Sequence, residues 1–403
     1  MEEYKFSFME QWKQYKLEEL SKGKGTYGIA ASAVPYDPNK LTYLRITDIN
    51  DDGTINRAGL MSVDEPNASD YLLYKNDLVF ARTGNSTGRA YFYQGTECPL
   101  VYAGFLIKFS IDENKVNPRL LKYYTHSQPY YDWVKSFDTG GTRGNINAKT
   151  YGNMPVCLPS SRKMQDRIVE ILSSLDSKIE LNRRINDNLE QQAQALFDHY
   201  FDCESEYLDG ATSGTLIDIA TYLNGLAMQK FPPADIERSL PVLKIKELGQ
   251  RKCDNNSDLC SDSIDADYIV KNGDIIFSWS GTLLVDVWCG GKCGLNQHLF
   301  KVTPLKDYPQ WFVYYWTNRH LNKFQLIAKD KAVTMGHIKR GDLEKAEVTI
   351  PTEVNLLEIN SRIAPLYQSI IDRRLENSRL ENLRDTLLPK LMSGELKIND
   401  LNS

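Results

Sequence analysis

The chain contains an internal duplication: a block of its first half recurs in the same order in its second half. The offset between the copies shortens by several residues along the chain, as a few loop deletions in one copy would produce. A repeat this long is typical of a duplicated globular unit with a spacer, not of a solenoid. The matching segments are Y-L-R-I-T-D-I from Tyr43 and V-L-K-I-K-E-L from Val242, K-N-D-L-V-F-A-R from Lys75 and N-G-D-I-I-F-S-W from Asn272, and P-R-L-L-K-Y-Y from Pro118 and P-Q-W-F-V-Y-Y from Pro309.

Each copy is predicted to be an α+β domain, the first over residues 1–160 and the second over 204–351. At 403 residues the chain is long enough for two cores, since single domains rarely exceed about 250–300 residues. Alternating apolar runs bounded by Gly, Asn and Asp predict strands in the same order in both copies. The predicted strands are Leu44–Ile49, Leu78–Ala81, Ala90–Tyr93, Phe105–Phe109 and Met154–Leu158, then Leu216–Tyr222, Leu243–Leu248, Ile275–Trp279, Val285–Trp288, Leu299–Val302 and Glu347–Ile350. Helices are predicted at Leu17–Leu20, Arg119–Phe137 and Gln310–Ile327.

The segments after the two domains, residues 161–203 and 352–396, carry apolar residues at heptad spacing and predict two long helices, followed by a tail at 397–403. Sustained heptads favour a coiled coil, here an antiparallel one related by an internal pseudo-twofold. Each heptad column has one polar residue at its midpoint, and in an antiparallel pair Asn182 and Arg373 would meet. The alternative is that both helices bend there and both groups face water. The heptad positions are Ile168, Leu175, Asn182, Leu189 and Leu196, then Ile359, Leu366, Arg373, Leu380 and Leu387.

Composition restricts the partners and the compartment. The net charge is −5 and no segment is basic, which is unfavourable for a nucleic-acid partner unless positive charge gathers on one face or another subunit supplies it. The N-terminus lacks a secretory signal, and no run of about 18 apolar residues could span a membrane. Seven cysteines without framework spacing are typical of reduced thiols in a cytoplasm.

Motifs of catalysis and of metal binding are missing. Gly23–Gly28 matches G-x-G-x-x-G, but no buried strand precedes it, so a loop is predicted and not a dinucleotide site. The sequence has no P-loop, no [DN]-P-P-[YF] tetrad of an adenine methyltransferase and no clustered catalytic carboxylates. The spacing of Cys253, Cys260, Cys289 and Cys293 is poor for zinc. We therefore expect no catalytic centre and no metal site.

Two pairs of loops at matching places in the copies carry the polar residues suited to nucleic acid. Gly permits close backbone approach, while Arg, Asn, Ser and Thr bind phosphates and base edges. Solvated hairpin loops are the alternative interpretation. The candidate contacts are Arg82, Asn85, Thr87, Arg89, Arg143 and Asn145 in the first copy, and Trp279, Ser280, Thr334, His337, Lys339 and Arg340 in the second.

Over nearly its full length the chain resembles the specificity subunits of type I restriction–modification systems. Leu175–Phe197 (L-D-S-K-I-E-L-N-R-R-I-N-D-N-L-E-Q-Q-A-Q-A-L-F) is similar to the central conserved region of that family. Leu380–Leu396 (L-E-N-L-R-D-T-L-L-P-K-L-M-S-G-E-L) is similar to the distal one. The segments K-N-D-L-V-F-A-R and N-G-D-I-I-F-S-W are similar to strands of the family's target-recognition domains.

The resemblance implies a DNA-binding subunit without a catalytic centre, in which each target-recognition domain reads one half of a split sequence. It implies that the conserved helices set the spacing and dock two methyltransferase subunits, which bring S-adenosylmethionine and methylate adenine N6. Motor-nuclease subunits that use ATP and Mg²⁺ join that complex. No membrane partner and no cofactor bound by this chain are expected. The rival interpretation is a coiled-coil scaffold with two protein-adaptor domains and no role on DNA.

Overall fold

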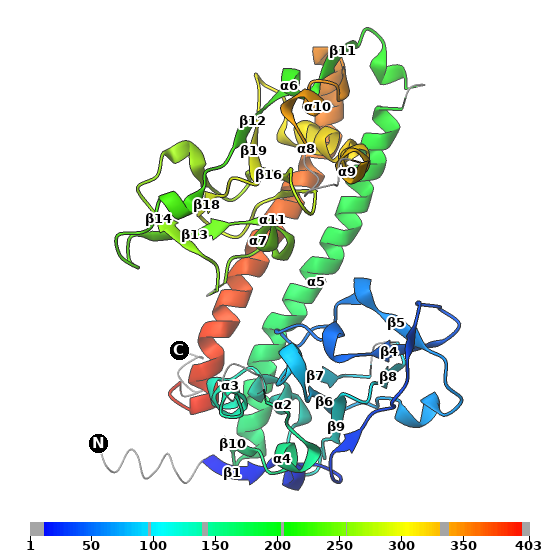
Figure 1. Cartoon of the computed structure of the whole chain (residues 1–403), viewed down its shortest axis with the longest axis vertical. Coiled ribbons are helices and arrows are strands. Elements are labelled where there is room, and N and C mark those ends of the chain that lie inside the picture. The colour runs from blue at the N-terminus through cyan, green and yellow to red at the C-terminus, as the bar shows by residue number, and fades with distance from the viewer. Residues whose placement is uncertain are drawn as a thin grey trace. The chain divides into compact units, whose positions relative to one another are not determined.

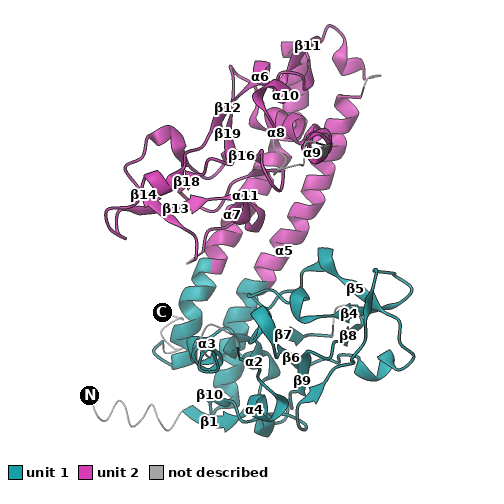
Figure 2. Cartoon of the chain, viewed as in Figure 1, with its two compact units in different colours: residues 1–176, 382–403 teal, residues 177–381 magenta. Residues whose placement is uncertain are grey.

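The computed structural model describes residues 12–95, 98–138, 144–202, 205–254, 256–330 and 338–396. Its internal contacts divide the chain into two compact units, the first comprising residues 1–176 and 382–403 and the second residues 177–381 (Figure 2). The divisions fall inside the two longest helices, α5 (Arg162–Tyr200) and α11 (Glu353–Ser393). Each unit therefore contains a stretch of both helices.

The described part of the first unit holds two four-stranded sheets and a two-stranded ribbon (Figure 1). One sheet has the order β2-β9-β6-β7 and is antiparallel throughout, and the other has the order β3-β5-β4-β8 with β4 and β8 parallel. Strand β1 pairs with β10. The strands are β1 (Trp12–Lys16), β2 (Thr26–Tyr27), β3 (Ala33–Val34), β4 (Leu41–Leu44), β5 (Met61–Val63), β6 (Asp77–Ala81), β7 (Ala90–Tyr93), β8 (Leu100–Tyr102), β9 (Leu106–Ser110) and β10 (Pro155–Pro159).

The second unit repeats this strand order. Its sheets are β12-β19-β16-β17, antiparallel throughout, and β14-β13-β18-β15, with β13 and β18 parallel, and β11 pairs with β20. The smaller sheets of the two units differ in their edge strands. The strands are β11 (Thr212–Thr215), β12 (Ala220–Asn224), β13 (Ser239–Leu243), β14 (Leu259–Ser261), β15 (Ile269–Val270), β16 (Ile275–Ser278), β17 (Leu284–Val287), β18 (Cys293–Leu295), β19 (Leu299–Pro304) and β20 (Glu347–Ile350).

Short helices cover the larger sheet in each unit and complete a mixed α+β architecture, which confirms the predicted class. In the first unit the core rings of Phe80 (β6) and Tyr151 (α4) stack at 4.5 Å between centroids. In the second, Phe277 (β16) and Phe324 (α9) stack at 5.8 Å. The helices are α2 (Pro118–Tyr124), α3 (Gln128–Lys135) and α4 (Ala148–Gly152), then α6 (Leu216–Ile219), α7 (Ile245–Gln250), α8 (Gln310–Arg319), α9 (Leu321–Asp330) and α10 (Arg340–Leu343).

Two predicted strands, at residues 44–49 and 243–248, are wrong in the same way. The strands end at Leu44 and at Leu243, and a helical turn follows each. The turn forms because the residue after the leucine gives its backbone N–H to an acidic side chain three residues further along the chain. Similarly, α6 replaces the start of the strand predicted at 216–222. The bonds that close the first two turns are Arg45 N to Asp48 Oδ2 (2.8 Å) and Lys244 N to Glu247 Oε2 (3.2 Å).

Helices α5 and α11 each bury two heptad columns, and the predicted column is the less buried of the two. In α5, Ile168 and Asn182 of the predicted column are buried, whereas its three leucines are half-buried; in α11 only Ile359 is buried. Two columns are what a pair of packed helices requires. The second column consists of Leu172, Ile179, Asn186, Ala193 and Tyr200 in α5, and of Ile363, Ile370, Asn377, Arg384 and Leu391 in α11.

A polar layer joins the two helices within the second unit. Asn182 Nδ2 donates to Asn377 Oδ1 at 2.9 Å and to Glu376 Oε2 at 2.7 Å, and Asn186 Nδ2 donates to the carbonyl of Ile370 at 3.2 Å. Partner numbers fall in α11 as they rise in α5, so these stretches run antiparallel. The prediction that Asn182 meets Arg373 was wrong.

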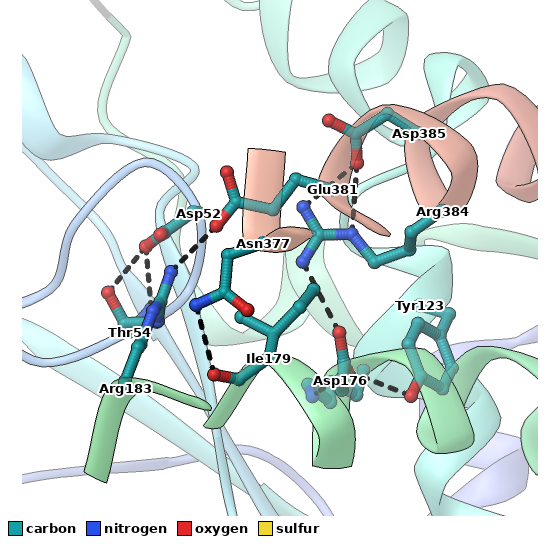
Figure 3. Close-up of polar contacts among 11 residues, drawn as sticks. Asp52, Thr54, Tyr123, Asp176, Ile179, Arg183, Asn377, Glu381, Arg384 and Asp385 are labelled. Atoms are coloured by element: carbon teal, nitrogen blue, oxygen red, sulfur yellow. Dashed lines mark hydrogen bonds and ion pairs between the residues drawn. The ribbon is translucent and has the colours of Figure 1, made fainter. Parts of the chain in front are cut away.

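Arg373 bonds to Ser369 of its own helix instead. A guanidinium is too long and too costly to desolvate for the centre of this seam, and Asn377, from the second column, occupies that place. Asn377 Nδ2 in turn donates to the carbonyl of Ile179 at 3.3 Å (Figure 3).

Replacing both Asn182 and Asn377 by leucine is expected to raise the free energy of unfolding by about 1–3 kcal/mol, because Asn182 is fully buried and its Oδ1 has no hydrogen-bond partner in the described part of the chain. Asn182→Leu alone is expected to destabilise, since it leaves the Asn377 amide without its partner. Urea denaturation of the double variant and of the single variants Asn182→Leu and Asn377→Leu measures both effects. A double variant less stable than either single variant would contradict the expectation.

Asp176 connects three helices within the first unit. It accepts from Lys122 Nζ at 2.6 Å, from Tyr123 Oη at 3.0 Å and from Arg384 at 3.2 Å (Figure 3). Burial alone would raise the pKa of Asp176, but Lys122 and Arg384, with the hydrogen bond from Tyr123, hold that pKa below its ordinary value. The ionised carboxylate therefore stabilises this unit.

Asp176→Asn is expected to lower the free energy of unfolding at pH 7 by about 2–3 kcal/mol. Because the pKa is depressed in the folded state, the stabilisation is complete above the unfolded value of about 3.9 and is lost as pH falls through the folded value. The stability difference between wild type and variant should therefore shrink below about pH 4. Denaturation curves between pH 3 and pH 7 test this, and a difference independent of pH would contradict it.

Candidate functional site

The same main-chain hydrogen bonds join the strand ends in both units, at the place where the predicted loops begin. Each bond of the first unit has a counterpart of similar length in the second, so residues 28, 82, 105 and 146 are equivalent to 225, 279, 298 and 338. The pairs are Gly28 N to Leu106 O (3.2 Å) and Gly225 N to Leu299 O (3.0 Å), Arg82 N to Phe105 O (3.1 Å) and Trp279 N to His298 O (3.3 Å), and Ile146 N to Arg82 O (3.0 Å) and Ile338 N to Trp279 O (2.9 Å).

We call the strand ends joined by these hydrogen bonds the main-chain frame. Gly28 and Gly225 stand where two backbone segments of the frame come closest. A Cβ at Gly28 would lie 2.2 Å from the carbonyl oxygen of Tyr102, and one at Gly225 would lie 2.2 Å from that of Asn296. Gly28 is the last glycine of the G-x-G-x-x-G match. It permits close approach of two backbone segments, in agreement with the loop prediction.

A buried ion pair also recurs at the start of the central strand. Asp77 binds Lys108 Nζ at 3.3 Å in the first unit, and Asp274 binds Lys301 Nζ at 3.3 Å in the second. Each carboxylate also accepts a backbone N–H three residues upstream. These aspartates are the D of K-N-D-L-V-F-A-R and N-G-D-I-I-F-S-W, so the repeated motif positions the strand that leads to the loop.

In the loop after β6, some of the predicted residues are exposed to solvent and others form hydrogen bonds within the unit. Arg82 is half-buried with its guanidinium 5.1 Å from the ring centroid of Tyr27, and Asn85 is exposed. Thr87 is buried and its hydroxyl donates to Gly84 O at 2.8 Å. Arg89 binds Asp51 at 2.7 Å and the carbonyl of Ile49 at 3.1 Å. Thr87 and Arg89 thus have structural partners within the unit.

In the second unit the equivalent loop is closed by side chains. Trp279 Nε1 donates to Asn224 Oδ1 at 2.9 Å, and the buried Ser280 Oγ lies 3.2 Å from His298 Nδ1. Gly84 and Gly281 occupy equivalent turns with φ of 70° and 66°, a conformation that favours glycine.

The second pair of predicted loops is described in part. Asn145 is exposed before α4, and Lys339 and Arg340 are exposed at the start of α10, where Arg340 is paired with Glu344 at 3.9 Å. The other three candidates lie outside the described residues: Arg143, Thr334 and His337.

Sequence inspection missed four side chains of these sites. Tyr27 and Phe105 are 42% and 57% exposed in the first unit, and Asn224 and His298 occupy the equivalent positions in the second. They come from strands β2 and β12 and from the segments before β9 and β19. The sequence signal that could have found them is Gly28, since alignment on the repeated glycine would have placed Tyr27 opposite Asn224.

Of the cysteines considered for zinc, Cys253 and Cys293 interact, and the neighbouring Cys293 lowers the pKa of the Cys253 thiol. Burial raises the pKa of the Cys289 thiol to about 11. Within the described ranges no three His, Cys, Asp or Glu side chains gather as metal ligands. No helix in those ranges is long and apolar enough to cross a membrane.

Known proteins are similar to this chain in sequence. Residues 9–191 match the type I restriction modification DNA specificity domain. The specificity subunit of the type I restriction enzyme MjaIX from Methanocaldococcus jannaschii is 25% identical over 72% of this chain and 72% of its own length. That of HindI from Haemophilus influenzae is 20% identical over 96% of this chain and its whole length.

A solved structure shares the fold. The crystal structure of a type I restriction–modification S subunit from M. genitalium aligns with a TM-score of 0.57 at 14% identity, over 94% of this chain and 96% of that one. This match shows a shared fold. The domain match and the two relatives favour DNA recognition over the protein-interaction scaffold considered above. Residues 9–191 therefore carry the DNA specificity domain of type I restriction–modification systems, and over most of its length the chain is similar to their specificity subunits, the non-catalytic subunits that recognise DNA.

Proposed function

We propose that the two halves of the chain, residues 1–160 and 204–351, each read one half of a bipartite DNA target. The observation that carries this proposal is the pair of equivalent main-chain frames, which end in loops of different side-chain composition. Two similar frames suit two similar tasks on one duplex. Different side chains suit a target whose halves differ in sequence.

The paired helices, residues 161–203 and 352–396, set the separation of the two half-sites as an antiparallel coiled coil. Their stretches in the second unit pack antiparallel around the asparagine layer, and those in the first unit share the buried leucines Leu172, Leu388 and Leu391. A continuous α-helix gains about 1.5 Å per residue. A helix pair of this length is therefore suited to define a distance.

Two methyltransferase subunits dock on these helices and bring S-adenosylmethionine to a flipped adenine, and motor-nuclease subunits contribute ATP and Mg²⁺. Those subunits supply the catalytic chemistry, for which this chain has no sequence motif. They also supply the positive charge that a chain of net charge −5 needs in order to approach phosphates.

The test is to co-express the chain with its methyltransferase subunits in a host without adenine methylation and to sequence the DNA by a single-molecule method. We expect N6-methyladenine in one split motif, with two defined halves and an undefined gap. Omission of the chain should abolish that methylation. Methylation at a continuous motif, or methylation that persists without the chain, would contradict the proposal.

A further inference from the structure

Building on the proposed function, we infer that three pairs of structurally equivalent positions, 27 and 224, 82 and 279, and 105 and 298, determine which bases each half of the chain reads. The three positions form one surface in each unit, which we call the triad. In the first unit the triad is Tyr27, Arg82 and Phe105, and in the second it is Asn224, Trp279 and His298.

Strand register places the members of each triad on one face. Ala81 pairs with Leu106 across β6 and β9, so the next pair outward is Arg82 opposite Phe105, joined by the 3.1 Å bond from Arg82 N to Phe105 O. Side chains directly opposite each other on antiparallel strands share a face. In the second unit the same pair is Trp279 and His298, whose ring centroids are 6.1 Å apart.

The first triad combines one arginine with two exposed aromatic rings. The Tyr27 ring lies under the Arg82 guanidinium, and the Tyr27 hydroxyl accepts the N–H of Ala148 at 3.1 Å, which fixes the ring. Phe105 is 57% exposed, so its ring is available for contact with a base. Arg82 Nε is buried without a hydrogen-bond partner in the described part of the chain.

This arrangement suits the Arg82 guanidinium to a base edge with two acceptors in one plane. Arginine binds guanine O6 and N7 with two parallel hydrogen bonds, and an apolar ring contacts the methyl group of thymine. The stacked tyrosine holds Arg82 in place before binding, so little side-chain entropy is lost. We therefore expect the half-site of the first unit to contain a guanine that Arg82 reads.

The second triad offers different groups from the same backbone positions. An indole N–H can only donate, so the bond from Trp279 Nε1 fixes the Asn224 amide with Oδ1 toward the ring and Nδ2 away from it. The amide then presents a donor, and the His298 ring is held against Trp279 and Ser280. The second triad contains no arginine. The pattern of donors and acceptors on base edges that it matches therefore differs from the pattern that the first triad matches.

The test exchanges the first triad for the second. A chain with Tyr27→Asn, Arg82→Trp and Phe105→His is co-expressed with its methyltransferase subunits, and the methylated motif is read by single-molecule sequencing. We expect one half of the motif to change while the other half and the gap stay as in the wild type. A motif unchanged in both halves, or changed in both, would overturn the inference.

Single substitutions decide the case in which the exchanged chain does not fold. Arg82→Lys keeps the charge but loses the paired hydrogen bonds, so it should relax one base position in one half and weaken binding at least about tenfold in a gel shift of the purified complex. Phe105→Ala should likewise relax recognition in the half of the motif that Arg82 reads. Matched controls are Arg57→Ala, an exposed arginine, and Tyr36→Ala, which removes a 58% exposed ring; both should leave the motif unchanged.

The outcomes separate this inference from the proposed function. A wild-type chain that directs methylation to no split motif refutes the proposed function. A wild-type chain that directs it to a split motif, with triad variants that methylate the same two halves and bind as tightly as the controls, refutes only the triad.

Discussion

Replacing Arg374 by methionine is expected to lower the free energy of unfolding of the second unit by about 3–5 kcal/mol. The Arg374 side chain is 11% exposed, and it binds Asp286 at 2.7 Å and Glu190 at 2.8 Å. Burial alone would lower the pKa of Arg374, but the two carboxylates raise it above the ordinary value. The substitution leaves the buried charge of Asp286 with Arg251 as its remaining partner at 2.6 Å.

Urea denaturation followed by circular dichroism measures the effect. Arg362→Met is the matched control, because Arg362 is exposed on the same helix, and it should change stability by less than about 0.5 kcal/mol. A variant in which Arg374, Asp286 and Glu190 are all replaced by apolar residues should recover much of the loss. A loss below about 1 kcal/mol for Arg374→Met would contradict the expectation.

Lengthening both long helices by one heptad is expected to widen the gap in the methylated DNA motif without changing either half. Seven helical residues add about 10 Å, and base pairs follow each other at about 3.4 Å, so the gap should grow by up to about three base pairs. A heptad preserves the phase of both buried columns. The insertions belong after Ser177 in α5 and after Glu381 in α11, next to the divisions between the units.

An insertion in only one helix is the matched control. It leaves one heptad of one long helix without a counterpart in the other, so the two helices can no longer keep their register on both sides of the insertion, and methylation should fall at every site. Single-molecule sequencing reads both results. If the doubly lengthened chain methylates the wild-type motif with the wild-type gap, the helices do not set the spacing.

The large features of the fold could be predicted from the sequence because they depend on regular periodicity. The strand at Ala90–Tyr93 and both long helices follow from alternation and from heptads, and they lie where they were predicted. The turns after Leu44 and Leu243 could not be predicted as strand ends, because R-I-T-D and K-I-K-E alternate like a strand. The capping carboxylate decides the outcome only once its distance to the backbone is known.

The candidate site was harder to predict, since its members are brought together by strand pairing. Arg82 and Trp279 were found because they end a recognisable repeated strand. Phe105 and His298 were not, because they precede β9 and β19 in segments without sequence similarity, and only the main-chain bonds make them equivalent. The partner of Asn182 was predicted wrongly because pairing was inferred within the leucine column, whereas Asn377 lies in the second column of the same helix face.

The strand ends that carry the triads are joined through backbone amides and carbonyls, with glycine where two segments come closest. None of those bonds depends on which side chain stands at the six triad positions. On the inference drawn above, mutation at these positions would change the sequence that one half recognises and leave the backbone of that half and the other half intact. A few codon changes would then give the host a new methylation signature.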